Sequence, residues 1–229
     1  MLKQALQKPR VQFLLLLFCA FLLKQVPYIG VGLQWLETFF HEISHGLAAI
    51  FTGGRILQIE LYPNGGGLCT TLGGSAMITA FSGYAGAVGW GCLLFLLATG
   101  IEKYSHWLSY ALLLLLAMTS ILWVRDIFTL MICLVLMGLF YSTTWLSSSQ
   151  FLPVVFKIFA LTVLLNALES PLVLFDGQAI GDGAALSSLT FIPEFVWIII
   201  WTLLALFTLF WLSGLGKRNK GVVSKHKGK

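Results

Sequence analysis

Long apolar segments, separated by short polar breaks, constrain the fold of this chain more than any other feature of its sequence. Seven such segments can be followed, at about residues 11–30, 33–51, 75–98, 107–124, 127–145, 153–168 and 192–212. A helix needs about 20 apolar residues to cross roughly 30 Å of hydrocarbon. The pattern therefore predicts an all-α polytopic membrane protein with about six to seven transmembrane or re-entrant helices.

The composition agrees with a membrane bundle that leaves no room for a second, soluble domain. The chain is 58% hydrophobic and only 10% charged, whereas soluble domains are about 25% charged. No long polar run interrupts the apolar segments. We expect one membrane-embedded domain over residues 1–216, followed by a basic tail over residues 217–229.

Basic residues gather at the two ends of the chain. The net charge is +5, and all nine acidic residues fall between Glu37 and Glu194. Nine of the fourteen basic residues are terminal: Lys3, Lys8, Arg10, Lys217, Arg218, Lys220, Lys225, Lys227 and Lys229. Basic flanks favour the cytoplasmic side and anionic lipid, so we expect contact with the bilayer and both termini in the cytoplasm. Nucleic-acid binding has no further support.

Cytoplasmic ends require an even number of crossings, although seven apolar segments are present. One segment is therefore expected to be re-entrant or incomplete. The candidates are the segment at residues 33–51 and the broken region before Ile192.

The most informative motif is H-E-I-S-H, which runs from His41 to His45 inside an otherwise apolar stretch. On a helix, His41 and His45 lie four positions apart and project from one face, where two imidazoles can bind one tetrahedral Zn²⁺. Glu42 is then placed to act as general base toward a water, as in H-E-x-x-H metalloproteases. The alternative is that the histidines only hydrogen-bond to a neighbouring helix. Because ionisable groups at membrane depth are costly and usually functional, we favour a site for one Zn²⁺.

Residues 55–74 differ from everything around them. Apolar and polar residues alternate on either side of P-N-G-G-G, which predicts a β-hairpin directly after the motif helix. The alternative is a solvated loop. A hairpin cannot expose unpaired edges to lipid, so it must lie at the water interface or against protein.

A catalytic zinc has three protein ligands and one open position, so the two histidines need a third partner. His106, in a polar break, and His226, in the tail, are interpreted as surface residues. An irregular stretch at residues 166–186 supplies the carboxylate candidates Glu169, Asp176 and Asp182. Irregular backbone at membrane depth is tolerated where it lines a cavity or is buried. The alternatives are an interfacial loop and, for Asp182, a helix N-cap.

Several motifs occur together: H-E-x-x-H, then G-G-R-I-x-x-I-x-L at residues 53–61, and a D-G near a later helix. Together they resemble the site-2-protease family of intramembrane zinc metallopeptidases. The runs F-S-G-Y-A-G-A at residues 81–87 and D-G-A-A-L-S-S-L-T-F-I-P-E-F-V-W at residues 182–197 resemble a compact bacterial branch of that family. The similarity covers most of residues 37–201.

The resemblance implies that His41 and His45 bind Zn²⁺ and that Glu42 is catalytic. In the compact branch the matching third ligand is Asp182. The better-known branch has an N-x-x-P-x-P-x-L-D-G pattern that points to Asp176, but here two residues too many separate Asn166 from Asp176.

The resemblance also implies a location and a substrate class. The expected location is the bacterial inner membrane, and the expected reaction is hydrolysis of peptide bonds in membrane-embedded or membrane-proximal proteins or peptides. Two other functions fit the residues: a membrane zinc enzyme that acts on another bond, and a catalytically silent scaffold or transporter. The sequence makes no prediction of oligomeric state or of a particular substrate.

Overall fold

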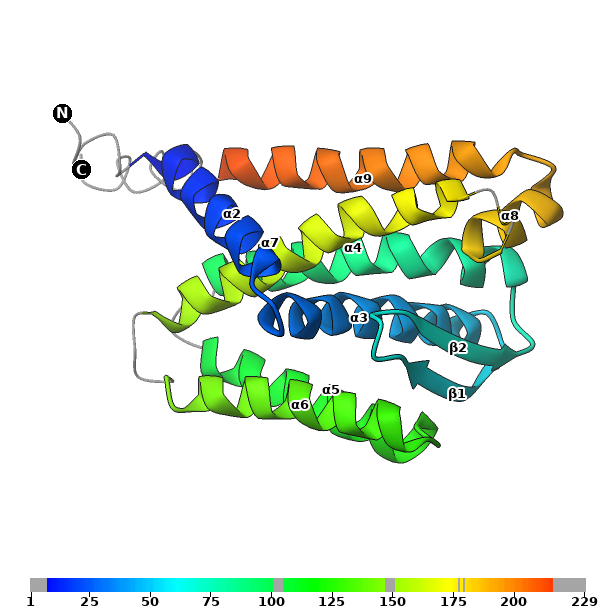
Figure 1. The fold of residues 1–229 in the computed structure, drawn as a ribbon, viewed down its shortest axis with the longest axis horizontal. Coiled ribbons are helices and arrows are strands. Elements are labelled where there is room, and N and C mark those ends of the chain that lie inside the picture. Colours follow the sequence, from blue (N-terminus) through cyan, green and yellow to red (C-terminus); the bar gives the residue numbers. More distant parts are fainter. Residues whose placement is uncertain (1–7, 101–104, 147–150, 177, 179, 216–229) are drawn as a thin grey trace, which may run out of the picture.

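The structure, a computed structural model, describes residues 8–100, 105–146, 151–176, 178 and 180–215. It is a bundle of helices with one small hairpin at one end (Figure 1), which confirms the predicted class. The elements are α2 (Pro9–Gln25), α3 (Ile29–Phe51), β1 (Arg55–Leu61), β2 (Gly67–Leu72), α4 (Ala76–Gly100), α5 (Ser105–Trp123), α6 (Ile127–Thr144), α7 (Leu152–Glu169), the 3₁₀ helix η2 (Ser170–Asp176), α8 (Asp182–Thr190) and α9 (Glu194–Leu215). The tail predicted at residues 217–229 lies outside the described residues.

Five stretches of the described chain are helical, long and apolar enough to cross a bilayer: α4, α5, α6, α7 with most of η2, and α9. The helices α2 and α3 are bent by 107° at a short break, and as one broken span they raise the number to six. Of the two candidates for an incomplete crossing, the H-E-I-S-H helix is therefore the one that belongs to a bent pair. Figure 1 shows that α2 begins and α9 ends at the same end of the bundle.

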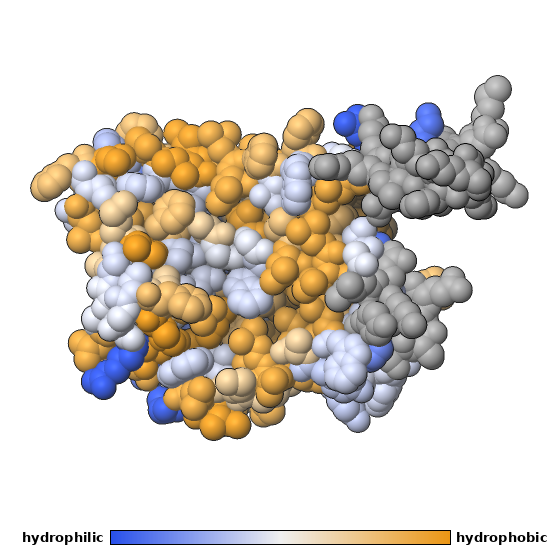
Figure 2. All heavy atoms as spheres, turned by 180° about the vertical axis from the view of Figure 1, so that it is seen from behind, coloured by the Kyte–Doolittle hydropathy of each residue, from blue (hydrophilic) through white to orange (hydrophobic). Residues whose placement is uncertain are grey.

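The surface of the bundle matches a lipid environment. Figure 2 shows a face covered largely by apolar side chains. The charged side chains of α3 are not on the surface, since Glu37 and Glu42 are buried together with His45. The polar groups of the motif helix thus face protein, which is where ionisable residues at membrane depth are found.

Helix α4 packs closely on α3. At Gly86, an added Cβ atom would lie 2.2 Å from Ser44 Oγ on α3, which leaves no room for a side chain. Trp90 Nε1 donates a hydrogen bond to the same Ser44 Oγ over 3.2 Å. The close approach lets α4 cover the face of α3 that carries the two histidines.

The predicted hairpin is present, and β1 and β2 pair antiparallel with Leu61 opposite Gly67 and Ile59 opposite Cys69. The amide of Leu61 donates to Thr129 Oγ1 on α6 over 2.8 Å, and the Thr129 hydroxyl donates back to the Leu61 carbonyl. Leu61 therefore turns its polar groups away from β2. Because antiparallel pairs alternate, Gly67 and Cys69 turn theirs away from β1, which makes this side of β2 the open edge.

The irregular stretch after α7 is tied to α3. The Asn166 side-chain amide donates to the Leu33 carbonyl over 3.2 Å, and the Ser170 hydroxyl contacts Glu37 Oε2 at the same distance. The chain then enters the short helix α8, where Leu186 is fully buried and packs in a cluster with Trp197 and Trp201. These contacts fix the start of α8 beside α3 and α4.

Candidate metal centre

The two histidines of the motif meet at one point inside the bundle. Their Nε2 atoms are 3.0 Å apart, and their rings are nearly perpendicular, with centroids 4.7 Å apart. His41 is half-buried and His45 is buried. The four-residue spacing on α3 therefore produces the convergence that the sequence predicted.

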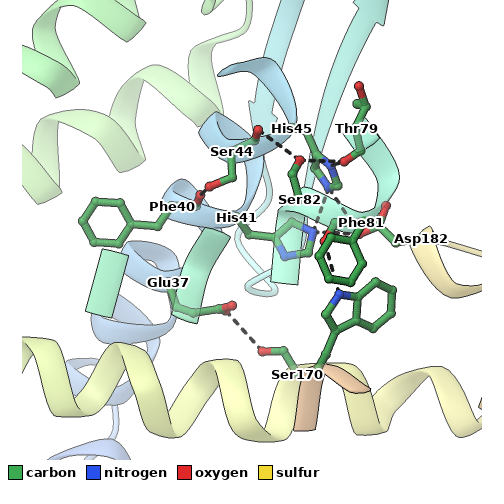
Figure 3. A network of polar contacts seen from close by, with 11 residues as sticks. Glu37, Phe40, His41, Ser44, His45, Thr79, Phe81, Ser82, Ser170 and Asp182 are labelled. Atoms are coloured by element: carbon green, nitrogen blue, oxygen red, sulfur yellow. Dashed lines mark hydrogen bonds and ion pairs between the residues drawn. The ribbon is translucent and has the colours of Figure 1, made fainter. Parts of the chain in front are cut away.

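Asp182 joins the two histidines from a position 141 residues away in the chain. Its Oδ2 atom lies 3.1 Å from His41 Nε2 and 3.2 Å from His45 Nε2 (Figure 3). Asp182 is the first residue of α8, and the N-cap position belongs to Gly181, whose φ of 101° favours glycine. The side chain therefore points at the histidines and does not cap the helix.

The hydrogen bond at His45 Nδ1 shows which nitrogen of this ring can bind a metal. His45 Nδ1 lies 2.7 Å from the Thr79 carbonyl oxygen, which can only accept, so Nδ1 carries a proton and the neutral ring presents a lone pair at Nε2. The Asp182 carboxylate and the Nε2 lone pair of His45 converge with His41 Nε2, a combination of groups that is typical of a cation site.

The distances also fit zinc. Ligand atoms about 2.1 Å from a tetrahedral ion are roughly 3.4 Å apart, close to the separations of 3.0, 3.1 and 3.2 Å found here. Two histidines and one carboxylate leave the fourth position open, as in catalytic zinc sites. Within the described part of the chain, one group of three such side chains converges in this way.

Helix α4 closes one side of the cluster. A Cβ atom at Gly83 would lie 2.4 Å from His45 Nε2 and 2.5 Å from His41 Nε2, so a glycine is needed there. The next residue, Tyr84, packs its ring edge-to-face with His41 at 4.4 Å between centroids. Both residues belong to the F-S-G-Y-A-G-A run.

Glu42 lies between the cluster and the hairpin. The backbone of Cys69 hydrogen-bonds its carboxylate, and a Cβ atom at Gly67 would lie 2.6 Å from Glu42 Oε1. The open edge of β2 therefore lies directly over the proposed base. Glycine at position 67 allows the strand to approach this closely.

Two cavities adjoin the cluster. A cleft of about 580 Å³ is lined by the three candidate ligands, by Glu42, by β2 from Gly67 to Cys69 and Thr71, and by the start of α4. A second cavity of about 340 Å³ lies toward Glu37, Asn64 and Ser170. His41 and Glu42 line both cavities, so an extended chain in the cleft would pass the candidate metal position.

The remaining predicted candidates lie elsewhere. Glu169 forms a salt bridge of 2.7 Å with Lys24, and more than half of its side chain is exposed. His106 packs on Trp107, as a surface residue would. The side chain of Asp176 and all of His226 lie outside the described part of the structure. Of the described carboxylates that the sequence left open, Asp182 is the one in the cluster.

Sequence reasoning missed three contributors to the site. Thr79 orients His45 through its carbonyl oxygen, Gly83 gives the imidazoles their space, and Tyr84 packs on His41. A backbone carbonyl leaves no mark in a sequence. Gly83 and Tyr84 both lie in the F-S-G-Y-A-G-A run, so the resemblance of that run was the signal that could have pointed to them.

The fold and the cluster together define a polytopic membrane protein with a partly buried His₂-carboxylate centre and a neighbouring buried glutamate. A family model described as Peptidase M50B-like matches residues 13–212. The chain therefore belongs to this family, which is part of the site-2-protease group of intramembrane metallopeptidases. A search of curated proteins and a search of solved structures each found no significant match.

Proposed function

We propose that this protein is an intramembrane zinc metallopeptidase that hydrolyses peptide bonds of membrane-embedded or membrane-proximal substrates. His41, His45 and Asp182 are the zinc ligands in this proposal, and Glu42 is the general base. The observation that carries it is the convergence of two Nε2 atoms and one carboxylate oxygen within 3.2 Å of one another, beside a buried glutamate.

Zinc, when bound, supplies Lewis-acid activation of a water and of the substrate carbonyl. Glu42 takes a proton from the water and delivers it to the leaving amine, which requires a carboxylate that is held in place. The Cys69 backbone provides that restraint. Thr79 keeps His45 in the tautomer that presents Nε2 to the cluster.

The open edge of β2 supports binding of an extended substrate. A peptide bond inside a helix is shielded by its own hydrogen bonds, so a substrate must unwind before hydrolysis. Strand addition to an unpaired edge stabilises the extended form. This edge borders the cleft. The Cys69 amide already bonds Glu42, which leaves the outward-facing groups of Gly67 and Thr71 for this mode of binding.

A bacterial inner membrane with both termini in the cytoplasm is the proposed location. Basic residues dominate both chain ends. The start of α2 and the end of α9 lie at the same end of the bundle (Figure 1). The partners are thus the lipid bilayer and a membrane protein or peptide substrate. A reporter that is active only in the cytoplasm should therefore be active when it is fused to the C-terminus of this protein.

Zinc content and cleavage test the proposal. Purified wild-type protein should carry about one zinc per chain, and His41→Ala and His45→Ala should lose it, whereas the control His106→Ala should keep it. Glu42→Gln should keep zinc but fail to cleave a single-span reporter protein that carries a fluorophore and a quencher on opposite sides of its membrane segment.

The other outcomes are equally informative. Stoichiometric zinc in both histidine variants would refute the metal site. Zinc in the wild type without cleavage of any amide bond would favour a zinc enzyme with another substrate, and absence of zinc from the wild type would favour a silent scaffold or transporter.

A further inference from the structure

Tyr84 occupies the junction between the two cavities. Four described residues line both of them: His41, Glu42, Gly67 and Tyr84. Under the proposed function, His41 binds the metal, Glu42 moves the proton and Gly67 has no side chain. Tyr84 therefore contributes the one neutral side-chain donor at the place where a peptide bond would meet both the metal and the base.

The ring of Tyr84 is held from two sides. It packs edge-to-face with His41 at 4.4 Å and lies at 48° to Trp201 at 4.7 Å between centroids. Trp201 is itself fixed, because its Nε1 donates to the Phe81 carbonyl over 3.2 Å. The phenol is thus a preorganised group, as a donor for a transition state needs to be.

The hydroxyl of Tyr84 is unused within the described part of the chain. Two neighbouring donors do have partners: the Ser82 hydroxyl donates to the Thr79 and Ser44 carbonyls, and Trp90 Nε1 donates to Ser44 Oγ. Tyr84 makes ring contacts but no hydrogen bond to a described residue. The Tyr84 hydroxyl is not a buried atom without a partner, and the residue lines both cavities. The hydroxyl is therefore accessible as a donor.

The described residues around the junction include several carboxylates but no cationic side chain that could stabilise negative charge on a substrate. The carboxylates of Asp182, Glu37 and Glu42 surround the phenol at electrostatic range, and the described lining of both cavities contains no lysine or arginine. Hydrolysis of an amide places negative charge on the carbonyl oxygen, and hydrogen-bond donors aimed at that oxygen stabilise it. A tyrosine, with an ordinary pKa of about 10, is such a donor at neutral pH.

We propose that the Tyr84 hydroxyl donates a hydrogen bond to the carbonyl oxygen of the scissile peptide bond and stabilises the charge that develops there. This inference rests on the proposed peptidase function. It assigns Tyr84 a catalytic role, since the hydroxyl would touch the reacting carbonyl group.

The test is Tyr84→Phe, which keeps the packing on His41 and Trp201 and removes only the hydroxyl. With the single-span reporter in vesicles, kcat should fall about 10²- to 10³-fold, as for other oxyanion donors, while KM, zinc content and Tm stay close to wild type. The matched control is Tyr110→Phe on α5, which is half exposed and contacts Trp107, and it should behave as wild type.

A binding measurement separates the two levels of the proposal. A peptide phosphinate mimics the tetrahedral state, so its affinity should fall about 100-fold in Tyr84→Phe and not in Tyr110→Phe. Wild-type kcat and phosphinate affinity in Tyr84→Phe would overturn the role of Tyr84 and leave the proposed function intact. A wild-type protein that neither cleaves the reporter nor binds the phosphinate would overturn both. Loss of zinc from Tyr84→Phe would overturn the donor role in favour of a structural one.

Discussion

Gly83 offers the sharpest test of the metal centre, because the expected effect follows from two distances. A Cβ atom at this position would lie 2.4 Å from His45 Nε2 and 2.5 Å from His41 Nε2. An ordinary contact is about 3.5 Å, so Gly83→Ala must move the imidazoles or α4 by about 1 Å. Metal–ligand distances tolerate only about 0.2 Å. We therefore expect zinc affinity to fall about 100-fold or more.

Two glycines of the same helix serve as controls for Gly83→Ala. Gly86→Ala would press a Cβ atom against Ser44 Oγ at 2.2 Å, whereas Gly89 has no atom within 4 Å of the added Cβ. Overpacking costs about 1–3 kcal/mol, so Tm should fall for Gly83→Ala and Gly86→Ala and not for Gly89→Ala.

Zinc should be measured by elemental analysis and by competition with a chelator of known affinity. It should be lost from Gly83→Ala alone. Wild-type zinc affinity in a folded Gly83→Ala protein would refute the placement of both ligand nitrogens against α4.

Three further predictions address the remaining parts of the site. Asp182→Asn should weaken zinc binding severely and abolish cleavage, because a neutral amide is a poor zinc ligand, while Asp176→Asn should do much less; the reverse ranking in elemental analysis would move the third ligand to Asp176. Thr71→Pro removes an outward-facing amide from the open edge of β2, where proline is tolerated, so kcat/KM for the reporter should fall while zinc is retained, and unchanged cleavage would remove the strand-addition role. Burial and the nearby Glu42 raise the pKa of the Cys69 thiol to about 12. The rate of maleimide labelling of Cys69, followed by peptide mass spectrometry, should therefore be very low at pH 8 and rise about tenfold per pH unit. Labelling as fast as that of a cysteine introduced by Leu68→Cys would contradict this.

The sequence by itself determined the local chemistry of this protein. Helical periodicity brings His41 and His45 to one face whatever the rest of the fold does, and Glu42 follows from its place between them. The apolar segments likewise predicted a helical membrane bundle, and the alternation around P-N-G-G-G predicted the hairpin. Each of these predictions depends on residues close together in the chain, where backbone geometry alone sets which side chains meet.

Only the tertiary structure decided which distant groups complete the site. From residue type alone, Glu169, Asp176 and Asp182 were all candidates for the third ligand. Packing of α8 against α4 and α9 places Asp182 at the histidines. Glu169 instead pairs with Lys24. The hairpin was predicted, but not that β2 carries the open edge, which follows from the bonds between Leu61 and Thr129 on α6. Contacts between residues 141 positions apart depend on how whole helices pack, and no local periodicity encodes that.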